Sequence, residues 1–231
     1  ITNMRKRTPF MLNYTSTGYY KMRAPDHLWR LVKEFWDENK EDQKLEGKVP
    51  GSTYRNSWKS PTYMVRVVDK ELRQALHDAA YDPLAAWSGQ ELRPSSLYGV
   101  RVYTNGAILA PHVDSLHLVI SAIVNVAQDV DEPWPLEVIG HDGKAHNITM
   151  VPGDMILYES HSIIHGRPFE LKGRFLANLF IHFEPTGRLL SQNEGLNPRQ
   201  HEMDQAFRDT VKQLQPGYET PDDDLPVQVL R

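Results

Sequence analysis

The spacing of the hydrophobic residues changes along the chain, and the change falls near Leu97. Within residues 25–40, apolar side chains recur every three or four positions, which predicts an amphipathic helix with Asp26 placed to cap its start. The same spacing within residues 69–81 predicts a second helix, and Pro83 should stop or kink it because proline has no backbone N–H. We expect both helices to cover a sheet.

Beyond Leu97, short runs of β-forming residues alternate with turn signals such as Asn105-Gly106 and Asp142-Gly143. The predicted strands span residues 98–103, 107–113, 118–126, 136–139, 145–151, 154–158, 163–168 and 174–183. Many short strands in succession are typical of a β sandwich or barrel. The predicted fold class is therefore mainly β with flanking helices.

These patterns divide the chain into three segments of one structural domain. Residues 1–96 form a helical and lid segment, because Pro and Gly cluster at residues 47–52 in a loop of the kind that can close over a site. Residues 97–186 form the β core. Residues 187–231 hold one short predicted helix, at residues 204–213, and then a polar, extended tail.

Composition narrows the possible functions. Hydrophobic residues make up 40% of the 231, which is enough for a sizeable core. The formal net charge is -4 and the one basic run, at residues 4–7, is short, so we expect no nucleic-acid partner. No apolar run reaches the roughly 20 residues that span a membrane. The expected partner is a peptide or a small-molecule substrate, and the oligomeric state stays open.

The chain contains no cysteine. This excludes disulfides, iron–sulfur clusters, thiolate zinc sites and a cysteine nucleophile, so any metal must bind His, Asp or Glu. The lack of cysteine slightly favours the cytoplasm, and the secretory pathway is the alternative compartment.

His112, Asp114 and His165 are the candidate metal ligands. His112 and Asp114 are two residues apart at the end of a predicted strand, so their side chains project to the same face. A third ligand must come from another strand, and His165 begins one about 50 residues later. Two histidines and one carboxylate leave metal positions open, as in the non-haem Fe(II) oxygenases.

Arg174 follows His165 by nine positions. A 2-oxoglutarate-dependent enzyme needs a fixed cation for the distal carboxylate of the cosubstrate, and arginine can supply two parallel hydrogen bonds. If the last strand starts at Arg174, then Leu176, Asn178, Phe180 and His182 share its face, and an entirely apolar set faces the other way. The mixed face suits the interior of a pocket.

Three stretches carry a family resemblance: His112-x-Asp114, residues 165–168 (His-Gly-Arg-Pro) and residues 172–174 (Lys-Gly-Arg). They resemble the prolyl 4-hydroxylase branch of the 2-oxoglutarate/Fe(II) dioxygenase superfamily, over roughly residues 98–185. The resemblance implies a double-stranded β-helix (jelly-roll) core. It also implies Fe(II), 2-oxoglutarate and O2 as cofactors, with ascorbate as a further candidate.

The resemblance assigns roles to individual residues. His112, Asp114 and His165 would bind the iron, and Arg174 would bind the distal carboxylate. Tyr103 stands where the family often has a tyrosine lining the cosubstrate pocket. Asn125 stands about where some members have a tyrosine that contacts 2-oxoglutarate, and Asn178 shares the Arg174 face; both are further candidate cosubstrate ligands.

The chain also departs from the family pattern, for example where many members have Gly-Gly-Glu-Thr and this chain has residues 131–137. The predicted function is hydroxylation of an aliphatic carbon, with peptidyl proline as one substrate. The alternatives are a hydroxylase of a free amino acid or other small metabolite, and a non-catalytic metal-binding jelly-roll. We expect Arg101, Arg167 and His182 to make ordinary salt bridges or hydrogen bonds.

Overall fold

The computed structural model describes residues 12–46 and 60–186. The predicted loop at residues 47–52, the helix at residues 204–213 and the tail lie outside the described residues. The described part is mostly β-sheet with two helices, as the sequence predicts. The finer assignment of a double-stranded β-helix stays a prediction.

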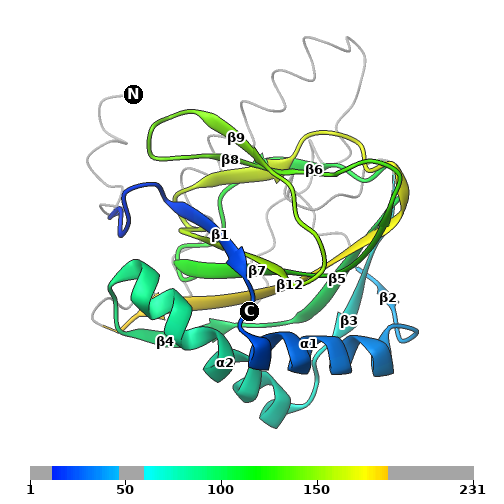
Figure 1. Ribbon diagram of the computed structural model, residues 1–231, viewed down its shortest axis with the longest axis horizontal. Helices are drawn as coiled ribbons and strands as arrows, with labels where there is room; N and C mark the ends of the chain where they lie inside the picture. The colour runs from blue at the N-terminus through cyan, green and yellow to red at the C-terminus, as the bar shows by residue number, and fades with distance from the viewer. Residues whose placement is uncertain (1–11, 47–59, 187–231) are drawn as a thin grey trace, which may run out of the picture.

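The larger sheet has eight antiparallel strands in the order β1-β10-β7-β12-β5-β3-β2, with β4 also pairing with β12 (Figure 1). Its strands are β1 (Tyr19–Arg23), β2 (Lys44–Leu45), β3 (Thr62–Arg66), β4 (Leu92–Ser96), β5 (Gly99–Thr104), β7 (Ile120–Val130), β10 (Asp154–Tyr158) and β12 (Gly173–Pro185). The long strands β7 and β12 lie side by side at its centre.

The smaller sheet has four strands in the order β6-β11-β8-β9 and faces the larger sheet (Figure 1). These strands are β6 (Leu109–His112), β8 (Leu136–Ile139), β9 (Ala145–Ile148) and β11 (Ile164–Arg167). β6 and β11 pair so that His112 lies opposite His165. The side chains of His112 and His165 can therefore both point into the space between the two sheets.

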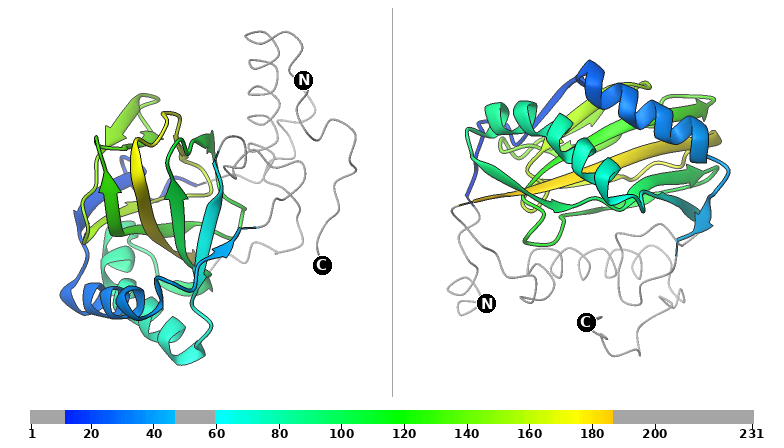
Figure 2. Two further views of the ribbon diagram at one scale, coloured as in Figure 1. Left: turned by 90° about the vertical axis from the view of Figure 1, so that its right-hand side faces the viewer. Right: turned by 90° about the horizontal axis from the view of Figure 1, so that it is seen from below.

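Helices α1 (Asp26–Asn39) and α2 (Lys70–Ser88) lie together on the outer face of the larger sheet (Figure 2). Their apolar faces form one core cluster with the outward-facing side chains of that sheet, including Ala177, Leu179 and Ile181 of β12. Burial of each large apolar side chain stabilises the fold by about 1.5–3 kcal/mol. The entirely apolar face predicted for the last strand is therefore the face that packs against the helices.

The prediction that Pro83 could stop the second helix is wrong, because α2 continues to Ser88. Leu76, Ala80 and Leu84 are fully buried on both sides of the proline, and their packing outweighs the hydrogen bond lost at Pro83. The helix ends at Gly89, whose φ of 66° suits a left-handed C-terminal cap.

Asp26 does not cap α1, because it is the first helical residue and Pro25 occupies the cap position without a side-chain hydrogen bond. Its charge can still favour the helix start, because acidic side chains complement the positive end of the helix dipole.

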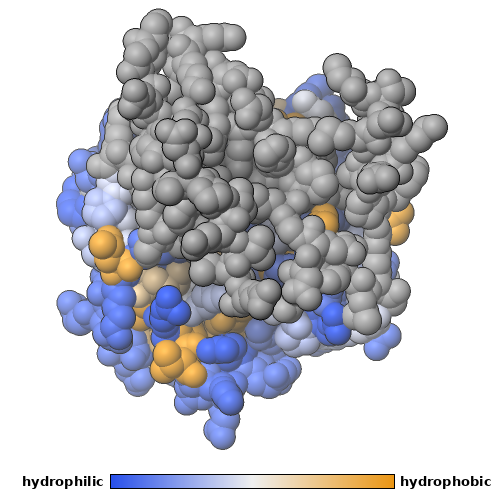
Figure 3. Space-filling model, turned by 180° about the vertical axis from the view of Figure 1, so that it is seen from behind, coloured by the Kyte–Doolittle hydropathy of each residue, from blue (hydrophilic) through white to orange (hydrophobic). Residues whose placement is uncertain are grey.

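The strands predicted at residues 136–139 and 154–158 have the same bounds as β8 and β10. Strands β1 to β4 were not predicted. β1, β2 and β4 are short and partly exposed, and β3 is a five-residue strand fixed by its pairing with β5, so tertiary pairing decides the conformation. The described surface in Figure 3 is mostly hydrophilic with small, separate apolar spots. Among the described helices, none is long and apolar enough to cross a membrane.

Candidate metal centre and its cavity

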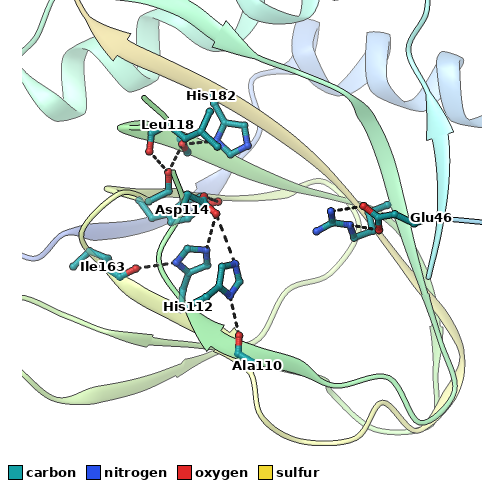
Figure 4. A network of polar contacts seen from close by, with 12 residues as sticks. Glu46, Ala110, His112, Asp114, Leu118, Ile163 and His182 are labelled. Carbon is teal, nitrogen blue, oxygen red and sulfur yellow. Dashed lines mark hydrogen bonds and ion pairs between the residues drawn. The ribbon is translucent and has the colours of Figure 1, made fainter. Parts of the chain in front are cut away.

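The three predicted metal ligands meet at one point between the sheets (Figure 4). One ligand atom from each of His112, Asp114 and His165 lies within 4.8 Å of the others. Asp114 Oδ1 is 3.7 Å from His112 Nε2 and 3.9 Å from His165 Nε2. This donor set, with two nitrogens and one carboxylate converging from one side, fits a divalent metal with open positions.

Hydrogen bonds to the backbone orient both histidine rings. His112 Nδ1 lies 2.8 Å from the carbonyl oxygen of Ala110, and His165 Nδ1 lies 2.8 Å from that of Ile163. A carbonyl oxygen only accepts, so each Nδ1 carries the proton and donates it. Each Nε2 therefore keeps its lone pair and points towards Asp114, which is the tautomer that metal binding requires.

The local electrostatics keep these ligands ready to bind a cation. Burial lowers the pKa of His112 to about 3, so its ring is neutral near pH 7. Burial opposes ionisation of Asp114, yet the neighbouring His165 and His182 bring its pKa below the ordinary value. Neutral imidazoles and an ionised carboxylate are the forms that bind a metal without first losing a proton.

Asp114 is held by the turn that follows β10. Its backbone N–H donates to the carbonyl oxygen of Ser160 at 2.7 Å, and the Tyr158 hydroxyl lies 3.4 Å from Asp114 Oδ2. The Tyr158 ring also packs edge-on against His165, with centroids 4.7 Å apart. Two of the three ligands thus depend on the end of β10 for their positions.

The three ligands line a cavity of about 490 Å³ between the sheets. Apolar side chains such as Leu109, Ile123, Leu136 and Phe180 form part of its wall. Its charged lining residues, besides Asp114, are Lys44, Glu46, Arg66, Arg101 and Arg167.

Arg174 does not reach this cavity, and this corrects the expectation drawn from its spacing to His165. Its side chain is 56% exposed and pairs with Asp129 and Asp131. The pairing of β12 with β7 shifts register between Gly173 and Phe175, next to that acidic pair. Arg174 therefore stays at the outer end of β12, where it bridges β12 to the end of β7.

Arg167 is the arginine that the structure places inside the cavity. It is 1% exposed, its guanidinium lies 4.6 Å from the centre of the Trp134 ring, and Nη1 donates to the Trp134 carbonyl oxygen. No carboxylate among the described residues pairs with it, and burial lowers its pKa to about 10. A buried guanidinium stays charged and is unfavourable until an anion compensates it.

Tyr103 and Asn178 line the same cavity as Arg167. With the Asn178 amide turned so that its oxygen faces Arg167, that oxygen accepts from Nη2 at 3.0 Å. The Tyr103 hydroxyl is buried, and the nearby guanidinium of Arg101 interacts with it. The structure therefore places two of the predicted cosubstrate ligands close to an unpaired buried cation.

Asn125 is buried but does not line the cavity. Its amide nitrogen donates to Gln128 Oε1 at 2.6 Å, which turns the side chain along its own strand.

The cavity's other inner cation, Arg101, makes two hydrogen bonds to Glu46, at 2.8 and 2.6 Å (Figure 4). Arg101 is thus compensated within the fold, as expected of an ordinary salt bridge, and Arg167 is not.

The sequence alone could have indicated Arg167 as the arginine of the cavity, but the family motif pointed to Arg174 instead. Arg167 lies two positions after His165 in the same predicted strand, so strand alternation alone places both side chains on one face. The register shift in β12 could not be foreseen from the pattern, because it depends on pairing with β7.

No protein-family model matches the sequence, and a comparison with curated proteins found no match. Solved structures do match. HygX from Streptomyces hygroscopicus, with nickel, 2-oxoglutarate and hygromycin B bound, aligns with a TM-score of 0.57 and 14% identity over 83% of this chain and 95% of that chain.

A 2OG-Fe(II) oxygenase family oxidoreductase from Burkholderia pseudomallei aligns with a TM-score of 0.51 and 12% identity, over 79% of this chain and 88% of that one. A prolyl hydroxylase from Trichoplax adhaerens, in complex with a peptide fragment of hypoxia inducible factor, aligns with a TM-score of 0.50 and 10% identity. That alignment covers 72% of this chain and 83% of the hydroxylase. At these identities the likeness concerns the fold. The chain therefore has the fold of the 2-oxoglutarate/Fe(II) oxygenases.

Proposed function

We propose that this protein is an Fe(II)- and 2-oxoglutarate-dependent oxygenase that hydroxylates an aliphatic carbon of its substrate. One observation carries the proposal: the His-Asp-His cluster lines the same cavity as a fully buried arginine that pairs with no carboxylate of residues 12–46 and 60–186. The three ligands of the cluster can bind a divalent metal, and the buried arginine can bind an anion. A dicarboxylate that binds the metal at one end and the arginine at the other satisfies both.

His112, Asp114 and His165 would hold the iron through Nε2, a carboxylate oxygen and Nε2. When bound, iron with 2-oxoglutarate supplies the activation of O2, with succinate and CO2 as co-products. Zinc would also fit two histidines and a carboxylate, so the donor set alone does not choose the metal. The lack of cysteine and the anion site beside the cluster favour the oxygenase over a structural zinc domain.

Arg167 would bind the distal carboxylate of 2-oxoglutarate. Stacking on Trp134 and the hydrogen bond to the Trp134 carbonyl oxygen fix its guanidinium before a ligand arrives. Its remaining N–H groups can donate to one carboxylate, and the Tyr103 hydroxyl and the Asn178 amide can add to that contact. Because these groups are already dry and oriented, little further ordering is needed when the carboxylate binds.

The chain's other contribution is to keep water away from the reacting groups. Leu109, Ile123, Leu136 and Phe180 give the cavity apolar walls beside the metal ligands. Such walls strengthen the charge interactions inside and protect a reactive centre from side reactions. Oxygen must enter the same cavity. Ascorbate is a candidate reductant that keeps the iron in the Fe(II) state.

Two substrate classes follow from the matched structures. HygX binds hygromycin B, and the Trichoplax adhaerens enzyme binds a peptide. A small polar molecule is the first candidate, because the cavity between the sheets has a volume of about 490 Å³ and carries several charged side chains. Peptidyl proline is the second, because the sequence motifs resemble prolyl 4-hydroxylases. Succinate production against proline-rich peptides, free amino acids and small polar metabolites separates them.

Anaerobic addition of Fe(II) and then 2-oxoglutarate tests the proposal. The expected result is a weak visible charge-transfer band that depends on both additions and that Asp114→Ala eliminates. A colourless protein that binds zinc tightly and gives no band with Fe(II) and 2-oxoglutarate would contradict the oxygenase and support a structural metal domain.

A further inference from the structure

His182 is a buried histidine beside the metal cluster, and the proposed function gives it no role. It lies on β12, is 5% exposed and lines the cavity (Figure 4). Its ring is enclosed by the fold, and burial disfavours the charged form of an imidazole. It is not part of the described cluster of ligand atoms, which consists of His112, Asp114 and His165.

A chain of hydroxyl groups holds the His182 ring. His182 Nδ1 lies 2.7 Å from the Ser121 hydroxyl oxygen, and that oxygen lies 2.7 Å from the Ser160 hydroxyl oxygen. Ser160 in turn donates to the carbonyl oxygen of Leu118 at 2.6 Å. Ser121 and Ser160 are both fully buried, so water cannot supply substitutes for these bonds.

The direction of the protons follows from the end of that chain. The Leu118 carbonyl oxygen only accepts, so the single Ser160 proton is used there; Asp114, which Ser160 also influences, is likewise an acceptor. Ser121 must then donate its own proton to Ser160. Its oxygen is left to accept from His182 Nδ1–H, and this fixes the ring as the tautomer with a bare Nε2.

We infer that His182 Nε2 accepts a hydrogen bond from a hydroxyl group of the primary substrate. The inference rests on the proposed function and names the substrate class, a hydroxyl-bearing molecule. Nδ1 is occupied by Ser121, so Nε2 is the ring nitrogen available on the cavity wall. An acceptor without a proton can recognise only a donor, and a neutral ring beside Asp114 gives no attraction for an anion.

The charges around the cavity favour a hydroxyl over an ammonium group as that donor. Lys44, Arg66, Arg101 and Arg167 line it, against Glu46 and Asp114. Iron with 2-oxoglutarate adds equal positive and negative charge, so this excess of cations remains in the loaded enzyme. An ammonium group of the substrate would be repelled by these cations, whereas a hydroxyl group would not.

The tautomer can be measured without knowing the substrate. The experiment is 15N NMR of histidine-labelled protein loaded with Zn(II) as a diamagnetic metal, with His182 assigned by His182→Gln. We expect a protonated Nδ1 and an unprotonated Nε2, and Ser121→Ala should redistribute the proton between them. A protonated Nε2 in the wild type would overturn the inference.

Ligand binding supplies the second test, with glycerol, myo-inositol and methyl glucoside as probes of the Zn(II)- and 2-oxoglutarate-loaded protein. At least one should bind, about fivefold to tenfold more weakly to His182→Phe, with partial recovery in His182→Gln. His146→Phe, a partly exposed histidine of β9 outside the cavity lining, is the matched control and should bind like wild type.

No binding of any probe, or equal binding by wild type and His182→Phe, would overturn the inference. The amino analogue of methyl glucoside should bind more weakly than the parent glucoside, and tighter binding would contradict the choice of hydroxyl over ammonium. Binding of 2-oxoglutarate in the same titrations decides the proposed function separately, because the contacts proposed for the distal carboxylate are those of Arg167, Tyr103 and Asn178.

Discussion

Arg167 lies two residues after His165 on β11, and both side chains line one cavity from the same face of that strand. The strand therefore supplies a metal ligand and an anion ligand together. Gly166, between them, faces the neighbouring strand β6. A Cβ built there would lie 2.9 Å from the Leu109 carbonyl oxygen and from backbone atoms of Pro111.

The first prediction concerns that glycine. In Gly166→Ala the added methyl group should push β11 away from β6 and separate His165 from His112, which now lie opposite each other. Metal affinity and 2-oxoglutarate affinity should both fall by about tenfold or more. Titration with Co(II), followed by its visible absorption, measures the first, and calorimetry measures the second.

Gly143→Ala is the control, because a Cβ at Gly143 meets nothing within 4 Å; its φ of 73° adds local strain in a turn remote from the site. It should lower stability without changing either affinity. Wild-type affinities in a folded Gly166→Ala protein would show that the spacing of β6 and β11 does not set the site.

The second prediction concerns Glu159, which is fully buried next to the turn that holds Asp114. Its carboxylate accepts hydrogen bonds from the backbone N–H groups of Tyr14 and Thr15, at 3.0 and 2.9 Å, and from the Thr15 hydroxyl at 2.7 Å. Glu159→Gln replaces one acceptor oxygen by a donor. The free energy of unfolding in urea should fall by about 2–3 kcal/mol.

Lys33→Gln removes an exposed ion pair to Asp37 on α1 and should change that free energy by less than about 0.5 kcal/mol. If Glu159→Gln were as stable as Lys33→Gln, the buried carboxylate would not anchor the segment at residues 14–15.

Much of this architecture could be predicted from the sequence, because it follows from local pattern. Strand alternation separated the apolar face of β12 from its cavity face, as the structure shows. His112 and Asp114 converge as predicted, although β6 ends at His112 and Asp114 is held by its hydrogen bond to Ser160. The exact bounds of β8 and β10 follow from the turn signals around them.

What the sequence could not supply depends on pairing between distant segments. β1 is fixed by β10 and by the ion pairs of Lys21 and Arg23 with Asp154, none of which appears in the local pattern of residues 19–23. Arg174 was assigned by its distance from His165, but Asp129 and Asp131 draw its side chain outward. The groups proposed to bind the distal carboxylate come from three strands of the two sheets: Arg167 from β11, Tyr103 from β5 and Asn178 from β12.

The third prediction concerns stability at low pH. His77 packs edge-on against Phe183 between α2 and the sheet, and burial lowers its pKa below 6.5. As the pH falls below 6.5, the unfolded chain takes up a proton that folded His77 does not. Stability should therefore be full above pH 6.5 and decline below it, by up to about 1.4 kcal/mol per pH unit for this group.

His77→Leu should show a smaller loss of unfolding free energy between pH 7 and pH 5 than the wild type. His27→Leu, at an exposed position of α1, is the matched control. An identical pH dependence in His77→Leu and wild type would contradict the assignment of this loss to His77.

The fourth prediction separates the two arginines. Arg167→Met keeps much of the side-chain volume and removes the buried charge, so it should lose the contact with the distal carboxylate of 2-oxoglutarate. Arg174→Ala removes an exposed arginine that pairs only with surface carboxylates among its described contacts. The expected rise in the dissociation constant of 2-oxoglutarate is about 30-fold to 100-fold for Arg167→Met. For Arg174→Ala it is less than about twofold.

Anaerobic titration of Fe(II)-loaded protein with 2-oxoglutarate, followed through the visible charge-transfer band, is the most direct measurement of the central claim. The account predicts a band in wild type and in Arg174→Ala at similar 2-oxoglutarate concentrations, and a band in Arg167→Met only at much higher concentration. A normal titration for Arg167→Met together with a weakened one for Arg174→Ala would contradict it.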